Sequence, residues 1–101
     1  MSDLAATVID LLRKRSESIS CAESITGGAI TSKLVSVAGA SDVLLGSIVA
    51  YSKEIKMSQL GLSAELIDSK GLVSQEVAIE MAKGARQRLG SSWAISSTGS
   101  A

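Results

Sequence analysis

The chain lacks histidine and proline altogether, and its 101 residues include a single cysteine and only two aromatic residues, Tyr51 and Trp93. Without histidine there is no imidazole general base, no serine–histidine or cysteine–histidine catalytic pair and no histidine-ligated zinc site. A single cysteine also excludes a thiolate zinc cluster and an internal disulfide. Acid–base chemistry at neutral pH is therefore left to lysine, carboxylates, tyrosine or hydroxyl groups, and the core must be aliphatic.

The charge balance and the start of the chain argue against two classes of partner. Ten Lys and Arg residues match ten Asp and Glu residues, so the chain has no net attraction for a nucleic-acid backbone. Residues 1–15 place Asp3 early and the basic cluster last, the reverse of a secretory signal, and no apolar run approaches the roughly 20 residues of a membrane span. We expect a cytoplasmic protein with no nucleic-acid or membrane partner.

Helical and strand-like hydrophobic periodicities alternate along the chain. They predict helices over residues 3–15, 26–37, 53–60, 63–69 and 75–89, and strands over 18–22, 43–51 and 92–97. Helices interleaved with strands favour a single α/β domain over residues 1–101, a three-layer α/β/α sandwich with a mostly parallel sheet. Few strands are visible for this class, so we expect the last edge of the sheet to be left uncovered.

The predicted helices carry apolar faces that indicate how they pack. In the first helix the predicted buried face comprises Leu4, Val8, Leu11 and Leu12. In the longest helix it comprises Ala78, Ala82, Ala85 and Leu89, widened by Val77 and Met81. The charged residues of that helix are predicted to form a solvated face: Glu76, Glu80, Lys83, Arg86 and Arg88. Cys21, inside the first strand, is expected to be a small buried hydrophobe.

A first candidate site is the segment AESITGG at 22–28, between the first strand and the helix after it. Ligands of α/β sheets gather at the carboxyl ends of strands, where a glycine-rich turn into a helix presents backbone N–H groups to an anion. There the Ser24 hydroxyl could attack a carbonyl carbon while those N–H groups hold the oxygen. The same residues also fit an ordinary helix start, with Ser24 and Thr26 as caps and the glycines allowing close packing.

A second candidate, YSKEIK at 51–56, also lies where a strand runs into a helix. Lys56 in the first turns of that helix could point across the sheet edge toward Ser24. A lysine activates a serine only when neutral, which burial and the helix dipole favour and a carboxylate such as Glu23 or Glu54 opposes. The alternative is an ordinary solvated lysine.

A third candidate is SSTG at 96–99, where the last strand ends. Its hydroxyl and N–H groups would lie at the same edge of the sheet as the other two segments, although hydroxyls at strand ends are also common turn residues. Three candidate segments at three strand ends support a functional site more strongly together than each does alone. They predict one shared site at the carboxyl edge of the sheet.

Four segments match a known pattern in collinear order: AESITGG at 22–28, VAGASDVLLGSIVAYSKEIK at 37–56, LGLSAELIDSKGLVSQEVAIEMAKGARQRLG at 60–90 and AISSTGSA at 94–101. Their usual forms are AESCTGG, GAS-x6-G-x-VAYSNEAK, a GAVSEEVA-x-EMA-x-GAR helix and a strand ending in TG-x-AG. The chain therefore resembles the C-terminal domain of the CinA competence/damage-inducible family, which includes the nicotinamide mononucleotide deamidases.

The resemblance implies a hydrolase of pyridine-nucleotide salvage that uses neither metal nor cofactor. Such an amidase converts nicotinamide mononucleotide and water to nicotinate mononucleotide and ammonia. By the resemblance, Ser24 would be the nucleophile, Lys56 its base and later the proton donor to ammonia, and Tyr51 would stack on or hydrogen-bond the pyridine amide. The substrate-binding residues would be Glu23, Thr26, Gly27, Gly28, Thr98 and Gly99.

The chain departs from the family pattern in two motifs and at its end. Ile25 replaces the cysteine of AESCTGG, and YSKEIK replaces YSNEAK, which places Lys53 near the site. The family domain normally continues past TG-x-AG with a further strand and a helix carrying an arginine suited to phosphate. We therefore expect a shortened domain whose open edge is covered in a homo-oligomer. The alternative function is a non-catalytic CinA-like module for interaction or nucleotide binding.

Overall fold

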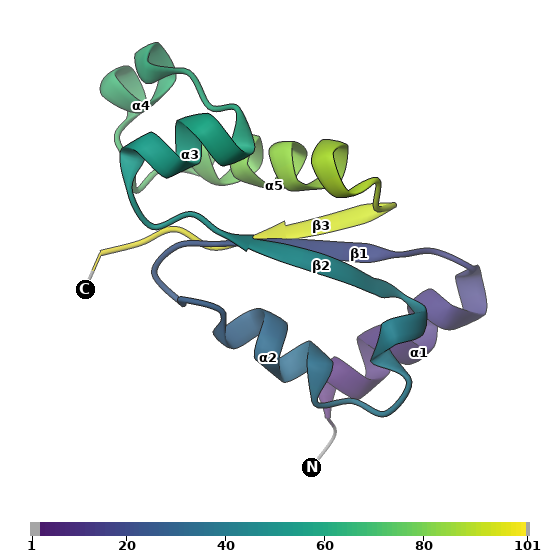
Figure 1. Cartoon of the computed structure of the whole chain (residues 1–101). Helices are drawn as coiled ribbons and strands as arrows, with labels where there is room; N and C mark the ends of the chain where they lie inside the picture. The colour runs from purple at the N-terminus through teal and green to yellow at the C-terminus, as the bar shows by residue number, and fades with distance from the viewer. Residues whose placement is uncertain (1–2, 101) are drawn as a thin grey trace.

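The computed structural model describes residues 3–100 and forms three layers, with a sheet between two groups of helices (Figure 1). One group packs against one face of the sheet: α1 (Leu4–Arg15) and α2 (Ala29–Val35), followed by the short 3-10 turn η1 (Ala40–Asp42). The other face is covered by α3 (Lys53–Leu60), α4 (Ala64–Lys70) and α5 (Gln75–Leu89). The sheet consists of β1 (Ile19–Glu23), β2 (Leu44–Val49) and β3 (Trp93–Ser96). The predicted α/β/α class is confirmed.

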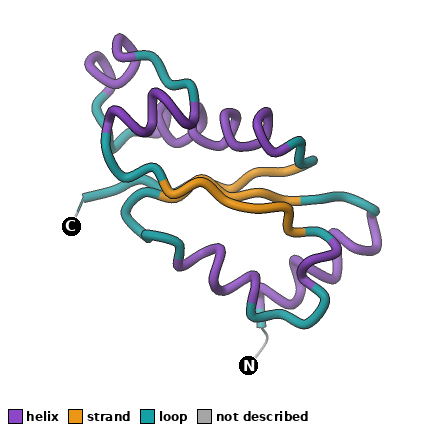
Figure 2. Tube along the Cα trace, in the orientation of Figure 1, coloured by secondary structure: helices purple, strands orange, loops and turns teal. Residues whose placement is uncertain are grey.

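All three strands run parallel, in the order β2-β1-β3, with β1 in the centre. Glu23 at the end of β1 is level with Val49 of β2, and Ala22 is level with Ser96 of β3. Pairing continues just past the strands, where the Ala50 N–H donates to Glu23 O at 2.8 Å and the Ser97 N–H donates to Ala22 O at 3.0 Å. The segments after the three strands therefore meet at one edge, as predicted (Figure 2).

Serine caps begin three helices on the α3–α5 side of the sheet. The hydroxyls of Ser52, Ser63 and Ser74 accept hydrogen bonds from the backbone N–H groups of Ile55, Leu66 and Val77. Each of these bonds satisfies a donor that the first turn of a helix leaves free. The predicted starts of α3, α4 and α5 are therefore confirmed.

The α3–α5 side of the sheet is closed by a tightly packed core. Val77, Met81 and Ala85 of α5 are fully buried against Ala22, Ala50 and Leu60. Where α3 crosses α5, a Cβ atom at Gly84 would collide with the backbone carbonyl group of Leu60. The glycine therefore lets the two helices approach backbone to backbone.

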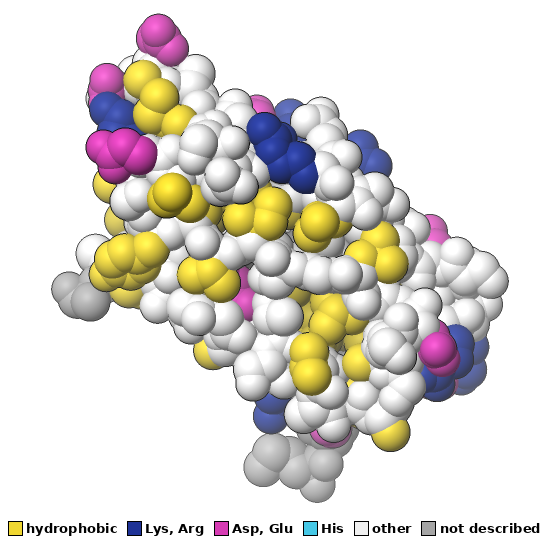
Figure 3. Space-filling model, in the orientation of Figure 1, with side chains coloured by type: hydrophobic (Ala, Val, Ile, Leu, Met, Phe, Trp, Pro, Cys, Tyr) yellow, Lys and Arg dark blue, Asp and Glu magenta, His cyan; other side chains and the backbone are white. Residues whose placement is uncertain are grey.

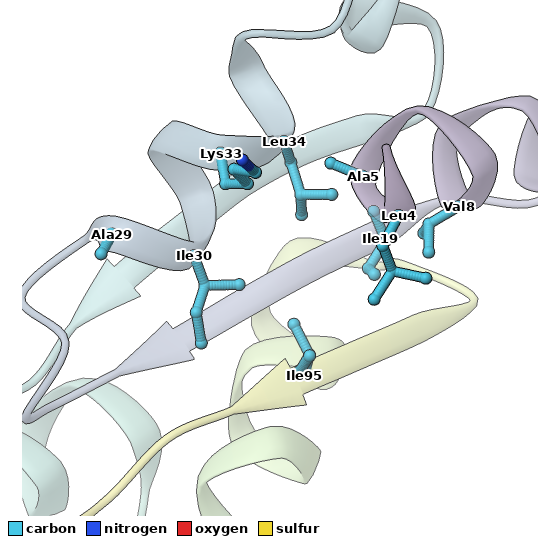
Figure 4. Close-up of a pocket in the computed structure, with 9 residues that line it drawn as sticks. All are labelled: Leu4, Ala5, Val8, Ile19, Ala29, Ile30, Lys33, Leu34 and Ile95. Carbon is cyan, nitrogen blue, oxygen red and sulfur yellow. The ribbon is translucent and has the colours of Figure 1, made fainter. Parts of the chain in front are cut away.

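The α1–α2 side is more open, and here the predicted face of the first helix is partly wrong. Ala5, Ile9 and Leu12 are the buried residues of α1, whereas Leu4 is 74% exposed and Leu11 is also exposed. The physical reason is that α1 covers the sheet incompletely. Leu4 and Val8 line an open cavity of about 430 Å³, into which Ile30 of α2 and Ile95 of β3 also point (Figure 4).

Two predicted elements differ from the structure by two or more residues at an end. The predicted 26–37 helix begins only at Ala29, because Gly27 and Gly28 adopt positive φ angles that interrupt the helical backbone. The predicted 43–51 strand ends at Val49, and Ala50 and Tyr51 turn toward α3. Cys21 is fully buried, as predicted. No helix among residues 3–100 is long and apolar enough to cross a bilayer.

Candidate active site

Ser24 and Lys56, which lie 32 residues apart in the chain, are in direct contact. The Lys56 Nζ atom lies 2.8 Å from Ser24 Oγ. Ser24 directly follows β1, and Lys56 is on the first turn of α3. Both side chains are buried, with exposed fractions of 5% for Ser24 and 1% for Lys56. The prediction that Lys56 points across the sheet edge toward Ser24 agrees with this geometry, and the solvated alternative for Lys56 does not.

The surroundings of Lys56 favour its neutral form. Burial lowers the pKa of the Lys56 amine below the ordinary value of 10.5. Apart from Ser24, the hydrogen-bond partners of its Nζ within residues 3–100 are two backbone carbonyl oxygens, those of Ala50 at 2.8 Å and Tyr51 at 2.9 Å. Within residues 3–100 it forms no ion pair with any carboxylate. Among the described residues, no carboxylate therefore offsets the cost of burying a positive charge there.

The three partners of the Lys56 amine fit both of its protonation states. An ammonium group has three hydrogens, which match the Ser24 hydroxyl and the two carbonyl oxygens. A neutral amine has two hydrogens for the two carbonyls, and its lone pair then faces Ser24, whose hydroxyl can donate to it. A proton can thus move between Ser24 and Lys56 without either side chain changing place.

Glu23 is fully buried, and its carboxylate holds the loop together rather than facing solvent. It accepts hydrogen bonds from the backbone N–H groups of Gly28, Ile30 and Thr31 and from the hydroxyls of Thr26 and Thr31. Burial raises the pKa of Glu23, but these hydrogen bonds outweigh it and lower the pKa to about 2. The carboxylate therefore stays ionised at neutral pH and caps α2 in place of the expected serine or threonine.

Some backbone N–H groups of the loop after Ser24 form hydrogen bonds within the protein, and others are available to a ligand. The Gly27 and Ala29 N–H groups donate within the turn, to Ser24 O and Thr26 O, and the Gly28 N–H is bound to Glu23. The N–H groups of Ile25 and Thr26 have no acceptor within residues 3–100. The free donors of this loop thus directly follow Ser24, rather than lying at the two glycines.

The other predicted site residues surround the same edge of the sheet. The Tyr51 side chain is 69% exposed, beside the backbone carbonyl that Lys56 contacts. The Thr98 hydroxyl donates to the carbonyl of Leu72 at 2.7 Å. A Cβ atom at Gly99 would come within 3.2 Å of Ile25, so the 97–100 segment lies against the Ser24 loop. Lys53 points elsewhere and pairs with Asp68 of α4 at 2.7 Å.

Sequence reasoning did not assign two hydroxyl residues that the structure places in this site. Ser97 lies 2.6 Å from Thr26, and Thr31 bonds both Glu23 and Ser47. Ser97 belonged to the predicted third segment, but nothing in the sequence separated it from its neighbours. Within residues 3–100 no group of three His, Cys, Asp or Glu side chains is arranged to hold a metal ion.

Comparison with known proteins places this arrangement in a family. The profile of the CinA C-terminal domain matches residues 1–101. A CinA-like protein of Prochlorococcus marinus (strain MIT 9313) is 49% identical over 96 residues, which are 95% of this chain and 22% of that protein. A CinA-like protein of Dictyoglomus thermophilum is 45% identical over 98 residues, 97% of this chain and 24% of that protein.

Solved structures agree with the sequence matches. The competence/damage-inducible protein CihA from Agrobacterium tumefaciens superposes with a TM-score of 0.90 at 33% identity, covering 95% of this chain and 60% of that one. The competence damage-inducible protein A from Klebsiella pneumoniae superposes with a TM-score of 0.91 at 30% identity, covering 93% and 58%. The chain spans about a quarter of the curated relatives and less than two thirds of these structures. It belongs to the CinA C-terminal domain family.

Proposed function

We propose that the chain is an amidohydrolase of the nicotinamide mononucleotide deamidase type, acting through Ser24 and Lys56. The observation that carries this proposal is the 2.8 Å contact between the Ser24 hydroxyl and a buried lysine amine. A serine becomes a nucleophile when a neighbouring base accepts its proton, and a lysine can be that base when burial lowers its pKa. In a chain without histidine, this pair supplies a serine and a base in direct contact.

The proposed reaction proceeds through an ester on Ser24. Ser24 Oγ attacks the carbonyl carbon of the nicotinamide amide while its proton passes to Lys56 Nζ. Lys56 then donates that proton to the amide nitrogen, the carbon–nitrogen bond breaks, and ammonia leaves. A water molecule next attacks the ester and gives a proton to Lys56, which returns it to Ser24 Oγ as nicotinate mononucleotide is released.

The remaining site residues have proposed roles in stabilising charge and holding substrate. The N–H groups of Ile25 and Thr26 are free to donate to the negative oxygen that forms during attack. The exposed Tyr51 ring would stack on or hydrogen-bond the pyridine amide. Gly27, Gly28, Thr98 and Gly99 would line the substrate, at the edge where the three strands end. We place this chemistry in the cytoplasm.

The test is to incubate the chain with nicotinamide mononucleotide and follow ammonia release. Ser24→Ala and Lys56→Ala are each expected to lower the rate by about 10³-fold or more, because each removes one half of the reacting pair. Lys53→Ala is the matched control, since it removes another lysine of α3 that pairs with Asp68 instead. We expect it to keep the parent rate.

Two outcomes would contradict the proposal. Parent-like rates in the Ser24 or Lys56 variant would show that the pair does not carry the reaction. If a folded parent chain released no ammonia, the alternative of a non-catalytic module would be favoured. Calorimetry would then show whether that module binds the nucleotide.

A further inference from the structure

A chain of hydrogen bonds leads from the buried Glu23 carboxylate to the backbone of Ser24. The Thr26 hydroxyl donates to Glu23 Oε1 at 2.6 Å. The Thr26 and Ser97 hydroxyl oxygens are also 2.6 Å apart. The Ser24 N–H in turn donates to Ser97 Oγ, with a nitrogen–oxygen distance of 3.4 Å. The chain thereby joins the end of β1, the loop after it and the segment after β3.

The proton order along this chain follows from simple counting. Each hydroxyl has one hydrogen to donate, and an ionised carboxylate can only accept. Because the hydrogen of Thr26 goes to Glu23, the Ser97 hydroxyl must be the donor in its bond to Thr26. The lone pairs of Ser97 then remain for the Ser24 N–H. A negative charge on Glu23 thus orients each hydroxyl in turn.

We propose that Glu23, Thr26 and Ser97 are positioning residues that hold Ser24 in line with Lys56. Ser24 is fixed at three points: its N–H by Ser97, its carbonyl oxygen by the Gly27 N–H at 3.1 Å, and its hydroxyl by Lys56. The anchors come from the segment after β3, the Ser24 loop and α3. This inference rests on the proposed function, because the residue being positioned is the proposed nucleophile.

The arrangement also assigns a different role to two predicted substrate-binding residues. The Glu23 carboxylate is buried, and the Thr26 hydroxyl is shared between Glu23 and Ser97. Their side-chain oxygen atoms form hydrogen bonds with other groups of the protein. A loss of this network should therefore disturb the reacting geometry and leave substrate affinity largely intact, because small displacements of reacting groups can cost about 100-fold in rate.

The test compares Thr26→Val, which keeps the side-chain shape but removes the hydroxyl, with Thr26→Ser, which keeps the hydroxyl. For ammonia release from nicotinamide mononucleotide, Thr26→Val is expected to lower kcat by about 10- to 100-fold with KM changed less than about 3-fold. Thr26→Ser should recover most of that loss. Thr7→Val is the matched control, because among the described residues the Thr7 hydroxyl donates to the carbonyl of Asp3, the N-cap residue of α1.

A second readout does not depend on activity. In ¹⁵N–¹H spectra, the Ser24 amide resonance should shift in Thr26→Val and return toward the parent position in Thr26→Ser. Ser97→Ala should move the same resonance, and it replaces Thr26→Val if that variant does not fold. If the parent chain releases no ammonia, the proposed function fails while the spectra still test the network. An unmoved Ser24 resonance, or an equal loss of kcat in Thr26→Val and Thr26→Ser, would overturn the inference.

Discussion

The two faces of the sheet differ in how completely they are covered, and the proposed chemistry lies with the better-covered face. On the α3–α5 face, Val77, Met81 and Ala85 are fully buried. On the α1–α2 face, Leu4 and Ile95 border a cavity open to solvent. Exclusion of water favours the neutral form of a lysine amine. The closed packing behind α3 therefore supports the low pKa that Lys56 needs.

The surface of the molecule also carries exposed hydrophobic side chains. Hydrophobic side chains extend across the middle of the face seen in Figure 3, and charged side chains lie mostly toward its ends. Tyr51, Val49 and Leu45, along and just after β2, are among the exposed hydrophobic residues. Exposed apolar side chains add little to the stability of the isolated chain.

The largest expected effect is on the closed face. Met81→Ala should lower the free energy of unfolding by roughly 2–5 kcal/mol, because a fully buried side chain leaves a cavity that its neighbours cannot fill. Urea unfolding followed by circular dichroism measures the change. A loss below about 1 kcal/mol would show that this face is not the better-packed one.

The next largest expected effect is the loss of the stabilising contribution of Glu23 at low pH. Its pKa is lowered to about 2 in the folded chain from the ordinary 4.5, so its contribution is present above pH 4.5 and is lost as the pH falls toward 2. The shift in pKa corresponds to a contribution of about 3 kcal/mol or less to the free energy of unfolding. Glu23→Gln should therefore be less stable than the parent at pH 7, and the difference should shrink toward pH 2. A difference that stays constant with pH would contradict this role of the carboxylate.

The smallest expected effect is on the open face. Leu4→Ala should change the free energy of unfolding by less than about 0.5 kcal/mol, because the side chain is largely exposed. The same urea measurement provides the comparison with Met81→Ala. A loss as large as that of Met81→Ala would mean that another surface covers Leu4 in solution. Light scattering then tests the expectation, drawn from the sequence, that copies of the chain associate.

Much of the fold followed from local pattern, because serine caps and glycine stops mark the helix ends directly. Ser52, Ser63 and Ser74 each begin a helix as predicted. The buried face of α1 was predicted only in part, because periodicity shows which residues are apolar and not how far a neighbouring layer extends. Leu4 belongs to the predicted apolar face, yet its side chain is 74% exposed.

The site shows the same limit. Strand ends predicted that Ser24, Lys56 and the 96–99 segment meet at one edge, and the structure brings them together. The pattern did not reveal that Glu23 would accept hydrogen bonds from N–H groups at the start of α2, since a carboxylate before a Gly-Gly turn has no distinctive spacing. It also did not single out Ser97, whose role depends on pairing between β1 and β3. Such contacts depend on register, which a single sequence does not contain.

The most direct test of the account is the pH dependence of kcat/KM for ammonia release from nicotinamide mononucleotide. Only the neutral Lys56 amine can accept the Ser24 proton, so the rate should rise with pH and level off at an apparent pKa below 10.5, because burial lowers the pKa of this amine. Lys53→Ala should leave that profile in place. A rate that still rises steeply at pH 10.5 would contradict a buried neutral lysine as the base.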